Sequence, residues 1–232
     1  RRGSYVPPGA TIERVEVPNE FRPAPQIGGL TALSYNESLA EGLPSAKAAI
    51  VKALKSGAHV IVVPYSQSSS LISEALKQLH DEGYDQSKLE VIYSSNPRAP
   101  LTGVEARLAG LYLPFLDVTF QGPAPTVTTG RSACRRYDPI CNFVDPSKMT
   151  LVDVFNVLPG YLLDHPDYYD IDLTNASTYE RDGITYVTVD DREVPLIRAL
   201  HGAGVVFEPL DQLIRSGVTN AQQHGPGTVE VS

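Results

Sequence analysis

The sequence predicts an α/β domain whose mostly parallel central sheet is flanked by helices. Two short runs rich in β-branched residues, 59–63 and 89–93, are typical of strands that are buried on both faces. The segment between them carries apolar residues at helical spacing and ends at Gly83. A strand, a helix and a second strand joined by short links form a βαβ unit, and such units build parallel sheets.

Composition favours one globular domain and excludes several classes of protein. The chain has 232 residues, of which 42% are hydrophobic and 20% are charged, so it is neither disordered nor collagen-like. Its net charge is -8 and no cluster of Lys or Arg could neutralise a run of phosphates, so we expect no nucleic-acid partner. The apolar runs are far shorter than the roughly 20 residues of a membrane span. We expect a single domain over residues 1–232, ending in a polar tail at 216–232.

The N-terminal part is expected to contain a strand and a long helix. Residues 11–17 alternate apolar and charged side chains, which indicates a strand. Ser34 and Glu37 have the spacing of a capping box and Gly57 supplies a stop signal, so a helix is predicted between them. Pro44 lies inside this helix and should kink its first turns. The apolar positions of the helix are Leu39, Leu43, Ala46, Ile50 and Leu54.

Further elements are predicted after the βαβ unit. A Pro-rich stretch, mostly ordered loop with one strand at 117–120, leads to a third helix. An Asp-Pro pair at 145–146 opens this helix and a Pro-Gly pair at 159–160 ends it. An Asp-Gly pair at 182–183 between β-rich runs indicates a hairpin, and a final helix is expected at 209–214.

A serine lies on the turn between the strand at 59–63 and the helix that follows. The turn reads Pro64-Tyr65-Ser66-Gln67-Ser68. In a nucleophile elbow, a serine at this position is held at the carboxyl edge of the sheet, where the helix N-terminus favours a developing negative charge. The usual pattern is Gly-x-Ser-x-Gly, and here Pro64 and Ser68 replace the glycines. Because capping serines are also common after a strand, the turn alone leaves catalysis and capping open.

A nucleophilic serine needs a histidine as base and a carboxylate that orients the histidine, and with this elbow the chain order is serine, acid, histidine. Of the five histidines, His165 is favoured because it follows the end of a helix, in a loop that could reach the sheet edge. His201 is a second candidate, with a surface loop residue as its alternative. The remaining three, His59, His80 and His224, lie before the serine, on the helix directly after it, and in the polar tail.

The two cysteines of the chain bracket a candidate acid. Cys134 and Cys141 permit one short-loop disulfide and exclude a four-cysteine zinc site, and two free thiols are the alternative. Asp138 lies between them, where a closed loop would fix the carboxylate that holds the histidine tautomer. Asp145 is the next candidate for this role.

The order Cys-x3-Asp-x2-Cys followed by His165 resembles cutinases, in which the catalytic aspartate lies between two bonded cysteines. Further segments resemble the actinobacterial PE-PPE domain, a cutinase-like, single-domain α/β-hydrolase of mycobacterial cell-envelope proteins. The resemblance covers most of residues 11–215, in the right order. The matching segments are Ser38-Leu39-Ala40-Glu41-Gly42, Tyr65-Ser66-Gln67-Ser68, Asn96-Pro97, Leu113-Pro114, Thr119-Phe120, Tyr137-Asp138, His165-Pro166-Asp167-Tyr168 and Pro195-Leu196.

The resemblance implies a role for each candidate residue. Ser66 is the implied nucleophile, Asp138 the orienting acid and His165 the general base. Gln67 is implied to donate its backbone N–H to the oxyanion hole, as the residue after the nucleophile does in this fold. No metal or cofactor is implied.

The resemblance also implies a cellular location. The sequence differs from the family pattern in two places. Cys134 and Cys141 are implied to form a disulfide, which favours a secreted or cell-envelope protein over a cytosolic one. Pro64 stands where the family usually has Gly. The family's first strand and its glycine-rich loop are expected to lie before this sequence begins, so that an N-terminal segment of the precursor would complete the sheet.

The implied reaction is acyl transfer through an acyl-serine intermediate. With water as the acceptor the protein is an esterase or lipase of acyl esters, and with a sugar hydroxyl it is an acyltransferase of trehalose-type envelope glycolipids. Peripheral association with a membrane or the envelope is expected in either case. The alternative from a different class is a catalytically silent hydrolase-fold module that binds lipid or a protein partner.

Overall fold

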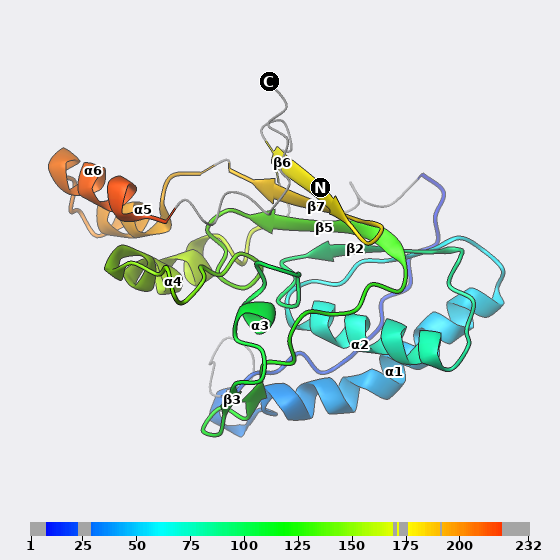
Figure 1. Ribbon diagram of the computed structural model, residues 1–232. Helices are drawn as coiled ribbons and strands as arrows, with labels where there is room; N and C mark the ends of the chain where they lie inside the picture. Colours follow the sequence, from blue (N-terminus) through cyan, green and yellow to red (C-terminus); the bar gives the residue numbers. More distant parts are fainter. Residues whose placement is uncertain (1–7, 23–28, 169–170, 172–175, 191, 220–232) are drawn as a thin grey trace.

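A five-stranded sheet forms the centre of the molecule (Figure 1). The computed structural model describes residues 8–22, 29–168, 171, 176–190 and 192–219. The strand order is β1-β2-β5-β7-β6, and all neighbours are parallel except β6 and β7. The strands are β1 (Val60–Val62), β2 (Leu89–Ser94), β5 (Thr129–Arg135), β6 (Ala176–Arg181) and β7 (Ile184–Val189). The predicted mostly parallel sheet and the hairpin at 182–183 are thereby confirmed.

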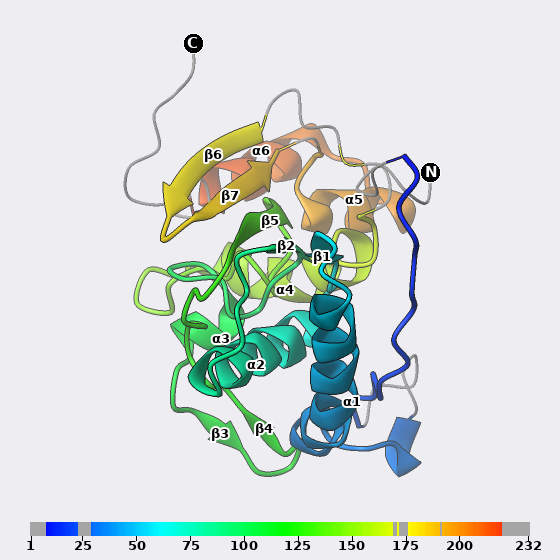
Figure 2. The ribbon, with the colours of Figure 1, turned by 90° about the vertical axis from the view of Figure 1, so that its right-hand side faces the viewer.

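Two long helices cover one face of the sheet (Figures 1 and 2). They are α1 (Tyr35–Lys55) and α2 (Gln67–Asp81). The predicted capping box at the start of α1 is present, since Ser34 Oγ accepts from Glu37 N and Glu37 Oε2 accepts from Ser34 N. Leu76 and Leu79 of α2 pack with Val91 of β2 in the main core, and each is at most 1% exposed. This burial holds α2 against the sheet.

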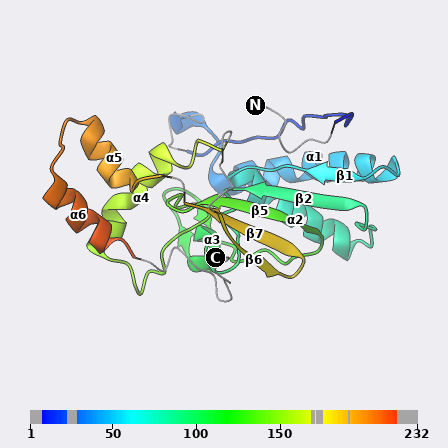
Figure 3. The ribbon, with the colours of Figure 1, turned by 90° about the horizontal axis from the view of Figure 1, so that it is seen from above.

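A second group of helices lies at the carboxyl end of the parallel strands (Figures 1 and 3). It comprises α4 (Leu151–Leu163), α5 (Pro195–Gly202) and α6 (Glu208–Gly217). Ile197 of α5 and Ile214 of α6 form a small separate core with Tyr137 and two valines. The short elements are η2 (Gly29–Thr31), α3 (Val104–Arg107) and the antiparallel pair β3 (Tyr112–Leu113) and β4 (Val118–Thr119).

Two predictions for the N-terminal half are wrong. Residues 11–17 pair with no described strand. They run along α1, where Glu13 forms an ion pair with Lys52 and Val17 packs against the main core. Strand β1 is only half-buried because it lies at the edge of the described sheet, and Val63 just beyond it is 47% exposed. Alternating or β-branched residues therefore do not by themselves reveal whether a segment lies inside a sheet.

The third helix also differs from its prediction. Helix α4 begins after Thr150, which forms a capping box with Asp153, and not at the Asp-Pro pair. It continues through Pro159 and Gly160 to Leu163. Strand β5 and helix α5 were not predicted, whereas the final helix is present as α6. Within the described residues, no helix combines the length and hydropathy that a membrane span requires. The tail from residue 220 onward lies outside the described residues.

Candidate active site

The turn between β1 and α2 has a strained backbone at Ser66. Its φ is 54° and its ψ is -127°, a combination that L-residues rarely adopt outside functional turns. The turn is tied to the end of β2, because Ser66 N donates to Ser94 O over 3.0 Å and Ser94 N donates to Pro64 O over 3.1 Å. The proline thus takes part through its carbonyl group and needs no N–H. This geometry holds the Ser66 hydroxyl at the carboxyl edge of the sheet.

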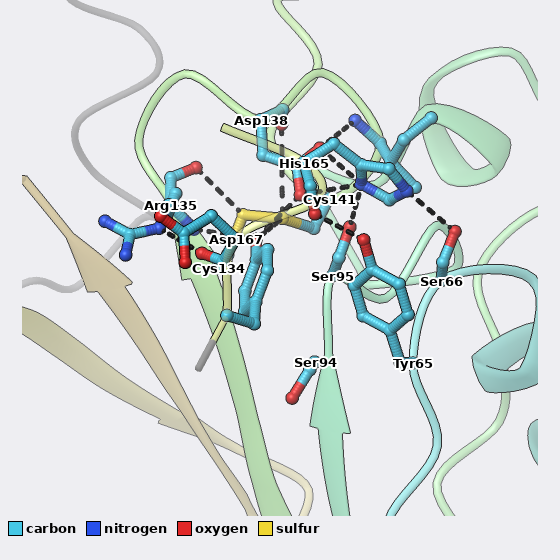
Figure 4. Close-up of polar contacts among 12 residues, drawn as sticks. Tyr65, Ser66, Ser94, Ser95, Cys134, Arg135, Asp138, Cys141, His165 and Asp167 are labelled. Carbon is cyan, nitrogen blue, oxygen red and sulfur yellow. Dashed lines mark hydrogen bonds and ion pairs between the residues drawn. A yellow bond between two sulfur atoms is a disulfide. The ribbon is translucent and has the colours of Figure 1, made fainter. Parts of the chain in front are cut away.

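The structure brings Ser66, His165 and Asp138 into one chain of hydrogen bonds (Figure 4). Ser66 Oγ lies 2.9 Å from His165 Nε2. On the other side of the ring, His165 Nδ1 lies 3.1 Å from both carboxylate oxygens of Asp138. Asp138 is fully buried and His165 is 6% exposed, whereas Ser66 is half-buried. The order of the groups is that of a nucleophile, a base and an orienting acid.

The loop that carries Asp138 is closed by a disulfide between Cys134 and Cys141. Within the loop, Ile140 N donates to Asp138 Oδ1 over 2.9 Å. Tyr168 donates its hydroxyl to Asp138 Oδ2 over 2.7 Å. Burial and the negative charge of Asp138 raise the pKa of Tyr168 well above its ordinary value, so the phenol stays protonated and remains a donor.

Comparison with known proteins identifies the family. The sequence model of the PE-PPE domain matches residues 8–219. The chain belongs to the PE-PPE domain family. No solved structure gives a significant match.

Three relatives from Mycobacterium tuberculosis each align with 90% of this PE-PPE domain. Esterase PE16 of strain H37Rv is 28% identical over 225 residues, which make up 42% of its length. The uncharacterized PPE family protein PPE28 of the same strain is 25% identical, with 33% of its length covered. The uncharacterized PPE family protein PPE42 of strain CDC 1551 is 27% identical, with 37% covered. The chain therefore spans less than half the length of these relatives.

A second serine of the PE-PPE domain contacts the histidine. Ser95 Oγ lies 2.9 Å from His165 Nδ1, on the same side of the ring as Asp138. Ser95 is fully buried and has a φ of 51°, so its backbone is strained as that of Ser66 is. Since one Nδ1–H faces three oxygen atoms, the ring is oriented by both residues. Sequence reasoning missed Ser95, although it lies two residues after the predicted strand at 89–93 and the carboxyl ends of neighbouring parallel strands meet at one edge.

Two tyrosines hold the imidazole ring from the sides. The rings of Tyr65 and Tyr161 stack against His165 with centroid distances of 5.2 and 5.1 Å. Tyr65 also donates its hydroxyl to the His165 backbone carbonyl. Tyr65 comes from the elbow and Tyr161 from the last turn of α4, so the two halves of the site meet at this ring.

Gln67 is placed where the resemblance expects an oxyanion donor. As the first residue of α2, it has a backbone N–H without an intrahelical partner. Its side chain is buried, and its Nε2 donates to Glu20 O over 3.2 Å. The N–H and the helix N-terminus both favour negative charge beside Ser66.

The alternative candidates for the base and the acid make contacts outside this hydrogen-bonded chain. His201 lies in the last turn of α5 and not in a loop, with its Nε2 2.8 Å from Asp211 Oδ2. Asp145 accepts from both the backbone N and the hydroxyl of Ser147. His224 lies outside the described residues.

Proposed function

We propose that this PE-PPE domain is a serine esterase that cleaves acyl esters of lipids. The observation that carries the proposal is the hydrogen-bonded chain from Ser66 Oγ through His165 to the buried Asp138. The similarity to a relative named as an esterase supports the same reaction class. The disulfide beside Asp138 supports an extracytoplasmic location, because such bonds persist in oxidising compartments.

In the acylation step, Ser66 Oγ attacks the ester carbonyl carbon while His165 Nε2 takes the hydroxyl proton. The carbonyl oxygen becomes an oxyanion that the Gln67 N–H stabilises. Asp138 and Ser95 hold the imidazole, and the Asp138 carboxylate stabilises the imidazolium that forms. When the intermediate collapses, the ester C–O bond breaks and the leaving alcohol takes the proton from Nε2.

In the deacylation step, an acceptor hydroxyl attacks the acyl-serine and His165 again carries its proton. Water as the acceptor releases a free carboxylic acid and restores Ser66. A sugar hydroxyl as the acceptor would instead give a new ester, which is the acyltransferase reaction on trehalose-type glycolipids. Which acceptor reacts depends on whether water is excluded from the acyl-enzyme.

Labelling with a fluorophosphonate probe tests the nucleophile. The wild-type chain is expected to be labelled and Ser66→Ala to remain unlabelled. Ser68→Ala is a matched control, because its hydroxyl is bonded to the Tyr65 backbone and not to His165. An unlabelled wild type, alongside a labelled known serine esterase, would identify the domain as a catalytically silent binding module.

A second assay separates hydrolysis from transfer. The wild-type chain is incubated with a monoacylated trehalose as the sole substrate. Hydrolysis predicts free fatty acid with no diacylated product, whereas a diacylated product without fatty acid would establish an acyltransferase. The same assay with Ser66→Ala controls for spontaneous hydrolysis.

A further inference from the structure

Helix α4 exposes apolar side chains and buries polar ones. The side chains on its exposed face are all apolar: Leu151, Val154, Phe155, Leu158 and Leu162, which we call the α4 face. Leu151 is 70% exposed, Phe155 60% and Leu158 63%. The polar side chains of the helix point inward instead, and Asp153 and Asn156 are buried. An ordinary surface helix has the opposite arrangement.

The buried polar residues attach α4 to the neighbouring segments. Asn156 Oδ1 accepts from Leu196 N in α5 over 2.9 Å. Besides its capping bond from Thr150 N, the Asp153 carboxylate accepts from the backbone N–H of Thr219, which follows α6, over 3.0 Å. Because these bonds use the polar side of the helix, they fix which side faces outward. The apolar α4 face is therefore a consequence of how the helix is held.

The α4 face lies beside the catalytic histidine. Tyr161 in the last turn of the same helix stacks on the His165 ring, and His165 follows the helix end by two residues. The helix stands at the end of the sheet toward which the parallel strands point (Figures 1 and 3). Leu162, at the C-terminal end of the α4 face, thus lies three residues before His165, whose ring faces the Ser66 hydroxyl.

Size and charge decide which kind of partner fits. A helix of 13 residues is about 20 Å long and offers a stripe of a few hundred Å², well below the roughly 800 Å² that each partner contributes to a stable protein interface. Asp153 is the only charged residue of α4 and it is buried. Several nearby charges pair with one another, as Arg198 does with Asp164 and Arg215 with Glu193, and Lys148 lies before the start of the helix. This uncharged surface suits the acyl region of a lipid layer and offers nothing to a charged partner.

We propose that the α4 face docks the domain onto a neutral lipid surface, so that ester substrates in that surface reach Ser66. The inference rests on the proposed function for the choice of a lipid partner. It adds the face that makes contact and the orientation of the domain, with the carboxyl end of the sheet toward the lipid.

Flotation with vesicles of phosphatidylcholine tests the docking. The full chain carrying Ser66→Ala is used, so that binding is measured without turnover. Phe155→Ser combined with Leu158→Ser is expected to lower the partition into vesicles about tenfold or more. The matched control combines Phe115→Ser with Leu30→Ser, which removes the same two residue types at exposed positions outside α4. The control is expected to bind vesicles as the parent does.

Three results would overturn the proposal. They are failure of the parent chain to float with vesicles, an equal loss in the α4 and control variants, and a self-associated parent that the α4 variant turns into a monomer in sedimentation velocity. Hydrolysis of a dissolved short-chain ester by the wild type is measured separately. A chain that floats but does not hydrolyse would refute the esterase function, and one that hydrolyses but does not float would refute only the docking.

Discussion

Helices α2 and α4 position the two residues of the Ser66–His165 hydrogen bond, yet they bury opposite kinds of side chain. Ser66 immediately precedes α2, and His165 follows closely after α4. Helix α2 buries Leu76 and Leu79 against the sheet and exposes charged residues at its end. Helix α4 buries Asp153 and Asn156 and exposes the apolar α4 face. Ser66 is therefore held by a helix that packs through apolar burial, whereas the helix beside His165 is held by hydrogen bonds and a close backbone contact, with Val152 packed against the small core.

This difference separates two requirements of the site. The Ser66 side needs a fixed, strained turn, which the well-packed α2 and β2 can hold in place. Under the docking proposal, the His165 side needs a helix that presents an apolar surface outward while it stays attached to the rest of the domain. Polar anchors on the inner side of α4 provide this. If the comparison is right, changes on the two helices will differ in kind: apolar truncation will damage α2, and polar or backbone changes will damage α4.

The largest effect is expected at Asp138, the proposed orienting acid in the loop that the disulfide closes. Asp138→Asn keeps the shape of the side chain but no longer stabilises the imidazolium or enforces the productive tautomer. We expect kcat/KM on a soluble ester to fall about 10⁴-fold, with little change in thermal unfolding. A variant within tenfold of the wild type would mean that Asp138 is not the orienting acid, and Asp145→Asn serves as the control because it lies outside the hydrogen-bonded chain.

Truncating one leucine on each helix tests the opposite packing directly. Leu76→Ala in α2 removes a fully buried side chain and is expected to lower the free energy of unfolding by about 3 kcal/mol. Leu158→Ala in α4 removes an exposed side chain and is expected to change it by less than about 0.5 kcal/mol. Urea denaturation measures both values. Similar losses in the two variants would contradict the inverted arrangement of α4.

A backbone contact of α4 predicts the next effect. A Cβ on Gly160 would lie 2.3 Å from Tyr137 O, and Tyr137 directly precedes the acid. Gly160→Ala should therefore push α4 away from the acid loop, costing about 2 kcal/mol of stability and lowering kcat/KM about tenfold or more. Gly202→Ala is the matched control, since nothing lies within 4 Å of a Cβ there, and it is expected to stay within about 1 kcal/mol of the wild type. Equal behaviour of the two variants would show that the contact is unimportant.

The same glycine shows where sequence reasoning worked and where it could not. Regular apolar spacing and a β-branched run before Ser66 made the α2 half predictable, because burial of apolar residues leaves a period in the sequence. Local rules predict a helix stop at the Pro-Gly pair at 159–160, because proline and glycine commonly end helices. A glycine is required at position 160 because the helix passes close to the carbonyl oxygen of Tyr137, which is far away in sequence.

Strand β5 was missed for a related reason. Its sequence Thr129–Arg135 contains Gly130, two arginines and small side chains, and Thr129 is its only β-branched residue, although it lies at the centre of the sheet. A Cβ on Gly130 would lie 1.9 Å from Val91 O, so close packing of strands requires the glycine. The cysteine spacing permitted a disulfide, but only the family resemblance chose it over free thiols. Contacts between distant segments, as at Gly130 and Ser95, leave no period that a single sequence could reveal.

The smallest expected effect concerns how pH acts on the polar anchor of α4. Burial by itself raises the pKa of the Asp153 carboxyl, but hydrogen bonds from Thr219 and Thr150 outweigh it and hold the pKa below its ordinary value. The stability from this carboxylate is therefore present above the unfolded pKa of about 3.9 and is lost as the pH falls through the folded pKa. Asp153→Asn should lower the free energy of unfolding by about 1 kcal/mol at pH 7, and the difference from wild type should shrink as the pH falls below about 4. Because helix α2 has no buried carboxylate, a difference that stays constant with pH in urea unfolding would mean that α4, like α2, is held by apolar packing.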